Sequence, residues 1–225
     1  MLTLHTAELL LPGHGLMPLP GGAVAVRGRE IAALGTPAEL AGRFPGARVR
    51  RWPGLLTPGL VNPWGPELLE GAYHPDPREA AELGTDPLTG AALDVLALSD
   101  TRWGGSARRG VQRMLAHGTV AVAGTLERPF ARDAADRSGL ARRQRSAAPP
   151  GPVSLDPLAG RTAPGPEVFA AARLSEGAPA AFAVFDVLGP GGAAPGADPC
   201  TALAARGAGR CVATVLGGRL VHRRR

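Results

Sequence analysis

Short runs that alternate apolar and polar residues lie near both ends of the chain and predict β-strands. The runs cover residues 2–7, 23–27, 30–34, 181–187, 211–216 and 219–222. Gly28 separates the second and third runs, and Gly217-Gly218 separates the last two. Glycine readily takes the positive φ that tight hairpin turns require. We therefore predict two hairpins, and a sheet that is assembled from both ends of the chain.

The middle of the chain has the periodicity and the capping residues of short helices. The predicted helices cover residues 76–84, 86–96, 106–118, 129–138 and 166–173, and a further strand is predicted at 119–123. Asp76 and Ser106 are the expected N-caps of the first and third helices, because their side-chain oxygens can accept hydrogen bonds from free backbone amides. Strands and helices together predict a mixed α/β fold.

Two stretches lack periodicity and are rich in Pro, Ala and Gly, which predicts loops or linkers at residues 141–166 and 189–199. The boundaries that follow are a β-rich domain of residues 1–54 and 174–225, a β/α segment of residues 55–140, and a linker of residues 141–166.

Composition narrows the classes of function. The net charge of +6 and the pI near 11 would suit a nucleic-acid partner. All 25 basic residues are arginine, however, and their clusters lack the interleaved aromatic residues on which bases stack, so we expect no such partner. No apolar run approaches the ~18 residues that cross a bilayer, and the first residues lack a signal-peptide pattern. We expect a cytoplasmic protein without a membrane partner, and buried, reduced thiols at Cys200 and Cys211.

Several segments resemble those of one enzyme family. Leu55-Leu-Thr-Pro-Gly-Leu-Val-Asn62 resembles the segment that opens the barrel of metal-dependent amidohydrolases. Residues 22–35 are similar to the family's N-terminal hairpin, and residues 106–124 are similar to its first barrel helix and second strand. Residues 174–186 and 212–221 are similar to the strands that complete its outer β-domain. The nearest branch is that of imidazolonepropionase and the aminodeoxyfutalosine deaminases.

The resemblance implies a β-sandwich-like composite domain, built from both ends of the chain, that carries a truncated β/α-barrel remnant. Chain length points the same way. Only about 110 residues separate Val61 from Leu174, whereas a complete β/α-barrel takes about 250, so at most two or three β/α units fit.

The departure from the family lies two and four residues after Asn62. There the family has paired histidines that bind zinc or iron, whereas this chain has Trp64 and Pro66. An indole nitrogen only donates hydrogen bonds, and a proline ring has no free lone pair, so neither residue can bind a metal ion. The later ligands of the family have no matching positions either. We therefore expect no metal cofactor, and Trp64 is a candidate to fill the vacated position.

A substitute site of carboxylate and imidazole groups could follow this segment. His74 with Asp76, and Glu67 with Glu70, are its candidate residues. The alternative is that Asp76 only caps a helix and that the other three lie on the surface. Among the remaining histidines, His117 is expected to interact with a helix C-terminus, and those at positions 5 and 222 are expected to be partly exposed on strands.

Three functions remain open. The first is a degenerate amidohydrolase-like protein that acts as a binding or partner subunit for a small molecule, a related amidohydrolase or a second copy of itself. The second is a hydrolase of carbon-nitrogen bonds, such as a deaminase or an imidazolonepropionase-like cyclic amidase, with a carboxylate or a histidine as general base. The third is a decayed gene product without a selected activity.

Overall fold

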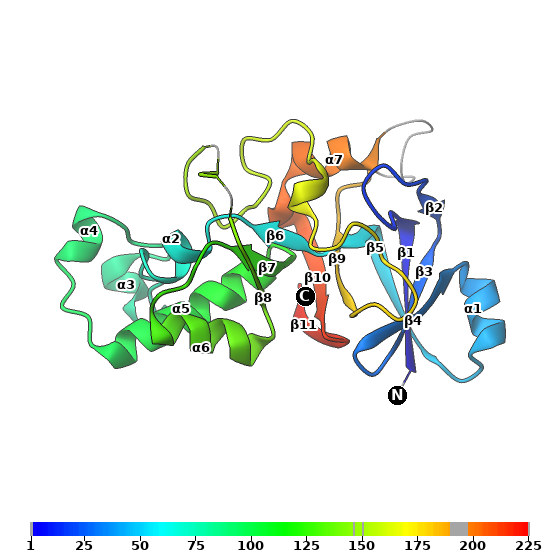
Figure 1. Ribbon diagram of the computed structural model, residues 1–225, viewed down its shortest axis with the longest axis horizontal. Helices are drawn as coiled ribbons and strands as arrows, with labels where there is room; N and C mark the ends of the chain where they lie inside the picture. The colour runs from blue at the N-terminus through cyan, green and yellow to red at the C-terminus, as the bar shows by residue number, and fades with distance from the viewer. Residues whose placement is uncertain (1, 146, 150, 190–197, 225) are drawn as a thin grey trace.

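The structure is a computed structural model that describes residues 2–145, 147–149, 151–189 and 198–224. Figure 1 shows a large sheet on one side of the molecule and a smaller sheet with most of the helices on the other. This arrangement confirms the predicted mixed α/β fold. None of the helices in the described ranges combines the length and the hydrophobicity that a bilayer crossing needs.

The large sheet has eight strands and unites both ends of the chain. Its strands are β1 (Leu2–Leu10), β2 (Leu19–Pro20), β3 (Ala23–Arg27), β4 (Glu30–Gly35), β5 (Arg48–Pro58), β9 (Ala181–Phe185), β10 (Cys211–Leu216) and β11 (Arg219–Arg223). The order is β11-β10-β9-β5-β1-β3-β4, and β2 pairs with β1. Among the described strands of this sheet, only β1 and β5 pair in parallel. The hairpins β3–β4 and β10–β11 confirm the two predicted turns.

Strand β5 joins the two ends of the chain, because it lies between β1 and β9. The sequence pattern did not predict this strand. Its register on β1 shifts at Pro53 and Gly54, where Gly54 has φ +73° and an added Cβ would overlap the Phe185 backbone. A glycine is therefore required at this bulge.

The segment before β9 connects the two hairpins at the ends of the large sheet. The backbone amide of Ile31 on β4 donates to Ala178 O at 2.9 Å, and that of Gly218 donates to Ala180 O at 3.1 Å. Gly218 has φ +73°, and a Cβ on it would overlap the carbonyl oxygen of Gly28. The two predicted hairpin turns thus lie against each other.

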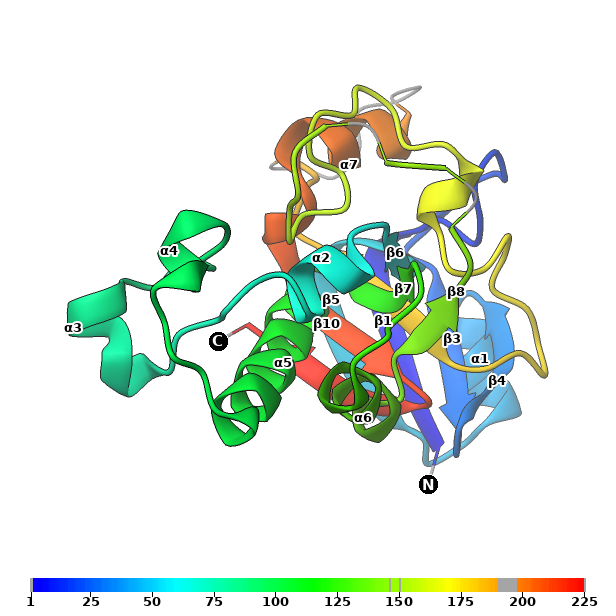
Figure 2. The ribbon, with the colours of Figure 1, turned by 60° about the vertical axis from the view of Figure 1, so that its left-hand side comes forward.

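The small sheet is parallel and consists of β6 (Leu60–Asn62), β7 (Thr119–Ala123) and β8 (Ala141–Arg143). Helices α5 (Asp100–Leu115) and α6 (Pro129–Ser138) connect these strands and cover one face (Figure 2). Val120 and Val122 pack toward these helices, whereas Ala121 on the opposite face packs against Ala170. Because β8 lies inside the predicted linker 141–166, that linker is not structureless throughout.

Short helical elements fill the connections. They are α1 (Pro37–Arg43), α2 (Gly65–Leu69), the 3-10 turn Pro77–Glu79, α3 (Ala80–Leu83), α4 (Ala91–Asp94), the 3-10 turn Pro166–Val168, α7 (Pro199–Arg206) and the 3-10 turn Ala208–Arg210. The predicted helix at 76–84 is confirmed, with Asp76 as its cap and Gly84 at its end. Most of the predicted loop 189–199 lies outside the described residues.

Three helix predictions were wrong in extent. Helix α5 begins at Asp100 with Ser99 as its N-cap, so Ser106 lies inside the helix. Its first turns are held by an ion pair of Arg102 with Glu79 at 2.8 Å, and by stacking of Trp103 on a phenylalanine of α6. The helix predicted at 86–96 is only one turn, and the helix predicted at 166–173 stops after Val168 because the next residue pairs with β6.

Candidate functional site

Parallel β/α units place their functional residues at the carboxyl ends of the strands. In this chain, β6 ends at Asn62, and helix α2 begins three residues later with Trp64 as its N-cap residue and Pro66 in its first turn. Trp64 is partly buried against the apolar cluster of α5 and α6. Pro66 lies against Gly124, at the end of β7. Whether the Trp64 ring fills the position of a metal ion stays a prediction.

The residues at this strand end do not fit the metal ion that the family resemblance implies. Trp64 and Pro66 have no lone pair for coordination. Within the described ranges, no group of three or more His, Cys, Asp or Glu side chains is placed to hold an ion.

The chain's own loop closes this strand end. The Asn62 Nδ2 atom donates to the carbonyl oxygens of Ser154 and Leu155 at 3.0 and 3.1 Å, and its Oδ1 accepts from the Trp64 amide at 2.8 Å. Arg145 forms an ion pair with Glu67 at 2.9 Å. The polar side chains nearest to the strand end are therefore engaged in holding the loop.

A cleft of about 610 Å³ lies beside α2. It is bordered by α2, the end of α5 and the loop at 153–156, and its polar lining residues are Glu67, Asp86, Thr89, Arg113, His117, Ser154 and Asp156. The Nδ1 atom of His117 is 2.8 Å from Arg113 O, within the last turns of α5. This contact confirms the predicted interaction of His117 with the helix C-terminus.

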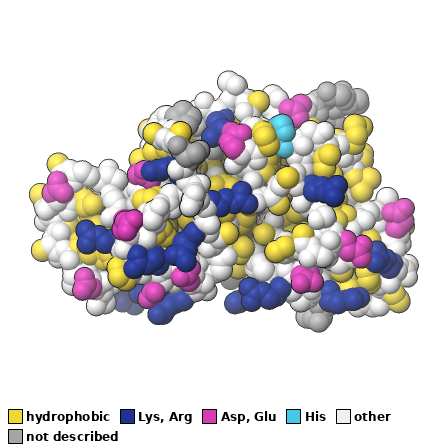
Figure 3. Space-filling model, viewed as in Figure 1, with side chains coloured by type: hydrophobic (Ala, Val, Ile, Leu, Met, Phe, Trp, Pro, Cys, Tyr) yellow, Lys and Arg dark blue, Asp and Glu magenta, His cyan; other side chains and the backbone are white. Residues whose placement is uncertain are grey.

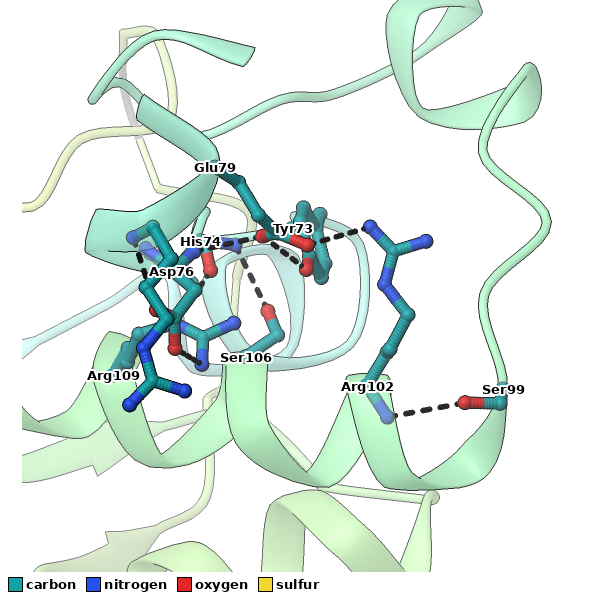
Figure 4. A network of polar contacts seen from close by, with 9 residues as sticks. Tyr73, His74, Asp76, Glu79, Ser99, Arg102, Ser106 and Arg109 are labelled. Atoms are coloured by element: carbon teal, nitrogen blue, oxygen red, sulfur yellow. Dashed lines mark hydrogen bonds and ion pairs between the residues drawn. The ribbon is translucent and has the colours of Figure 1, made fainter. Parts of the chain in front are cut away.

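His74 is fully buried, which corrects the alternative that it lies on the surface. Its Nε2 donates to Leu68 O at 2.8 Å, since a carbonyl can only accept. Its backbone amide donates to Ser106 Oγ at 2.9 Å, and Arg109 Nε donates to its carbonyl at 2.8 Å (Figure 4). Its Nδ1 is buried and has no hydrogen-bond partner among the residues that the structure describes. Burial lowers the pKa of His74 to about 4, so the ring is neutral at pH 7.

Asp76 belongs to a network of hydrogen bonds and ion pairs around the 3-10 turn Pro77–Glu79, which it caps (Figure 4). Its carboxylate accepts from the Arg78 amide at 3.1 Å and forms an ion pair with Arg109 at 3.2 Å. Glu79, the third helical residue of the same capping pattern, accepts from Tyr73 at 2.6 Å and from the Asp76 amide at 2.8 Å. The hydrogen bond from Tyr73 is the main cause that lowers the pKa of Glu79. The sequence signal for this network was the capping pattern itself.

The candidate residues therefore have separate structural partners. Glu70 accepts from the backbone amide of Arg128, at the start of α6, at 2.6 Å. Glu67 is paired with Arg145, and among the described residues neither carboxylate forms a hydrogen bond or an ion pair with His74.

The other histidines and the cysteines lie apart from this strand end. His5 is only 3% exposed, so its predicted partial exposure was wrong; its Nδ1 accepts from Trp52 Nε1 at 3.2 Å. Burial, and then the charge of Arg50, lower the pKa of His5 to about 4. His222 is half-buried, as predicted. The two cysteines are buried and free, which confirms their predicted state, and burial raises the pKa of both thiols to about 11.

No family model matches this chain, and no curated protein matches its sequence. Solved structures match it in part. An adenosine deaminase from Xanthomonas campestris with bound zinc is 21% identical, with a TM-score of 0.43 over 62% of this chain and 32% of that one. The E. coli guanine deaminase is 16% identical, with a TM-score of 0.42 over 64% and 35%.

An amidohydrolase from an environmental sample of the Sargasso Sea is 20% identical, with a TM-score of 0.40 over 64% of this chain and 33% of that one. The superfamily that the sequence motifs resemble is thus represented among the matching structures. The chain spans about a third of the length of these three structures.

Proposed function

We propose that this chain is a relative of the metal-dependent amidohydrolases that has lost metal-dependent catalysis and acts as a binding or partner subunit. The observation that carries the proposal is the pair Trp64 and Pro66 at the start of α2, where the family has its paired histidines. Neither residue can replace an imidazole ligand, because neither has a lone pair to offer.

The hydrogen bonds around the strand end support this proposal. A hydrolase that works without a metal ion needs a general base within reach of a water molecule and the substrate. His74 is fully buried, Asp76 is paired with Arg109, and Glu70 is bound to the backbone at the start of α6. Each of these three candidates thus has a structural role that explains it, and the fourth, Glu67, is paired with Arg145.

The domain boundaries are part of the same proposal. We assign the eight-stranded sheet to a composite outer domain of residues 1–54 and 174–225, and residues 55–140 to the first part of a barrel. Strand β5 continues to Pro58, so the end of this strand crosses the proposed boundary. The outer edge of β8 pairs with no further strand in the described part of the chain. An open edge of this kind is normally covered, so a related amidohydrolase or a second copy is the expected partner.

Metal content tests the proposal. The chain is purified from cells grown with excess zinc, iron and manganese, dialysed, and measured by mass spectrometry of the bound elements. We expect far less than one ion per chain. One zinc, iron or manganese ion per chain that survives dialysis would overturn the proposal. Size-exclusion chromatography of the same sample, alone and with an active amidohydrolase encoded nearby, tests the partner role.

The second candidate is a hydrolase of carbon-nitrogen bonds that uses the cleft beside α2. The observation in its favour is that His117 and Glu67 both line this cleft and could supply a general base. Deamination of purine nucleosides and ring opening of imidazolones are the assays. Turnover by the wild-type chain that is abolished in His117→Gln would establish this candidate and refute the first.

A further inference from the structure

A second cavity, of about 480 Å³, lies between the two sheets. Its walls come from the β3–β4 turn, the start of β8, the β10–β11 turn and residues 170–181. Its apolar lining residues include Ile31, Val120, Leu174, Ala181 and Leu216. Val120 and Ala141 are at the amino-terminal ends of β7 and β8, so this part of the lining lies away from Asn62, whereas Arg143 is the last residue of β8.

Three arginines and one carboxylate border this cavity. Arg29 comes from the β3–β4 turn, Arg143 from β8 and Arg173 from the segment before β9, and Glu30 is the single acidic residue. Among the described residues, none of these four side chains forms an ion pair. Figure 3 shows basic and hydrophobic side chains next to each other in the middle of the face that contains β8. The cavity border therefore carries more positive than negative side chains, and none of the three guanidinium groups is ion-paired in the described part of the chain.

Gly217 and Gly139 leave room in the cavity, because they add no side chain to its lining. Gly217 has no side chain, and a Cβ on it would lie 3.6 Å from Arg29 Nη2, so this guanidinium lies directly over the β10–β11 turn. The Arg143 guanidinium donates to Ala170 O, which keeps it at the wall formed by residues 170–174. Gly139 and five alanines among the lining residues add little volume to the interior.

We propose that this cavity binds an aliphatic carboxylate of medium chain length. Guanidinium groups recognise carboxylates through paired, charge-assisted hydrogen bonds, and three of them border the opening. The lining has no aromatic side chain, so the apolar part of the ligand is aliphatic. The volume lies in the range of natural small-molecule sites. The proposal stands whether or not the chain is catalytic, because the cavity shares no residue with the strand end at Asn62.

Isothermal titration with decanoate, below its micelle concentration, tests the proposal. We expect one saturable site per chain, with an affinity at least tenfold higher than that for decanol, which has a similar chain but no charge. Octanoate is expected to bind roughly tenfold more weakly than decanoate, because it buries two fewer methylene groups.

Two variants that change the net charge by the same amount distinguish binding at this cavity from attraction by the overall charge of the chain. Arg173→Gln removes a guanidinium at the cavity and is expected to weaken decanoate binding about tenfold. Arg206→Gln removes an exposed guanidinium on α7, away from the cavity lining, and is expected to leave the affinity unchanged. Ala141→Leu adds volume at an exposed position of the cavity wall and is expected to weaken binding of the longer ligand most.

The proposal is overturned if decanoate shows no saturable binding, if decanol binds as tightly as decanoate, or if the two arginine variants bind alike. Both arginines are exposed, so neither replacement is expected to unfold the chain; thermal unfolding of each variant verifies this.

Discussion

Two glycines of helix α5, Gly110 and Gly104, allow the cost of overpacking to be compared with the gain in helix propensity when glycine is replaced by alanine. A Cβ on Gly110 would lie 2.7 Å from His74 Nε2 and 3.0 Å from Leu69 Cδ2, both of them in fully buried side chains. Overpacking of this kind costs about 1–3 kcal/mol, whereas alanine gains about 1 kcal/mol over glycine in a helix. Displacement of His74 would also weaken its hydrogen bond to Leu68, at a cost of about 1 kcal/mol. We expect Gly110→Ala to lower the free energy of unfolding by about 2 kcal/mol.

The matched control is Gly104→Ala in the same helix. The nearest atom to a Cβ at this position is Arg108 Nη1 at 3.6 Å, the end of a flexible, exposed side chain. Only the gain in helix propensity then remains, so we expect stabilisation by about 0.5–1 kcal/mol.

Urea unfolding of the wild-type chain and of both variants, followed by circular dichroism, measures the two effects. The same substitution in the same helix should shift the midpoint in opposite directions, with the slope of the transition unchanged. A Gly110→Ala chain as stable as the Gly104→Ala chain would refute the close packing of α5 on His74.

Three further predictions concern pH, thiol reactivity and closure of the large sheet. Burial lowers the pKa of His5 and His74 from the ordinary 6.5 to about 4, so the unfolded chain binds protons first on acidification. The contribution of the two neutral rings to the free energy of unfolding is therefore complete above pH 6.5. It is lost as the pH falls from 6.5 to 4, by about 3 kcal/mol for each ring. Urea unfolding at a series of pH values should show a smaller loss for the His74→Gln chain than for the wild-type chain. Burial raises the pKa of both thiols to about 11, so a disulfide reagent at pH 8 should label the folded chain about a hundredfold more slowly than the unfolded chain. Gly218→Ala should destabilise the chain by about 2 kcal/mol more than Gly21→Ala in thermal unfolding, because both glycines have positive φ but only the first would meet the Gly28 carbonyl.

The elements that could be predicted from the sequence are those that are determined by residues close together in the chain. The two hairpins depend on alternating residues and on glycines at their turns, all within about a dozen positions. The absence of the paired ligands at Trp64 and Pro66 also needs only the identity of two residues and the motif before them. The capping pattern from Asp76 to Glu79 is local in the same sense, and the structure confirms it.

Features that depend on distant partners were missed. Strand β5 contains Pro53 and Gly54, which interrupt a strand pattern, yet its pairing with β1 and β9 accommodates them as a bulge. Ser99 and Ser106 could each cap α5. The helix begins at Ser99 because Arg102 in its first turn is paired with Glu79, 23 residues earlier. The cavity between the sheets is bordered by residues from five separated parts of the chain, and no local pattern brings them together.

The central position of β5 has a consequence for synthesis of the chain. During translation, one edge of this strand stays without its neighbour until β9 has emerged, about 120 residues later. At the usual ~5–20 residues per second, that delay is roughly 6–24 s, during which apolar Leu55 and Leu56 are not yet covered. The nascent chain is therefore exposed to aggregation over this interval, and chaperone binding or slowed synthesis at these codons would alter its yield.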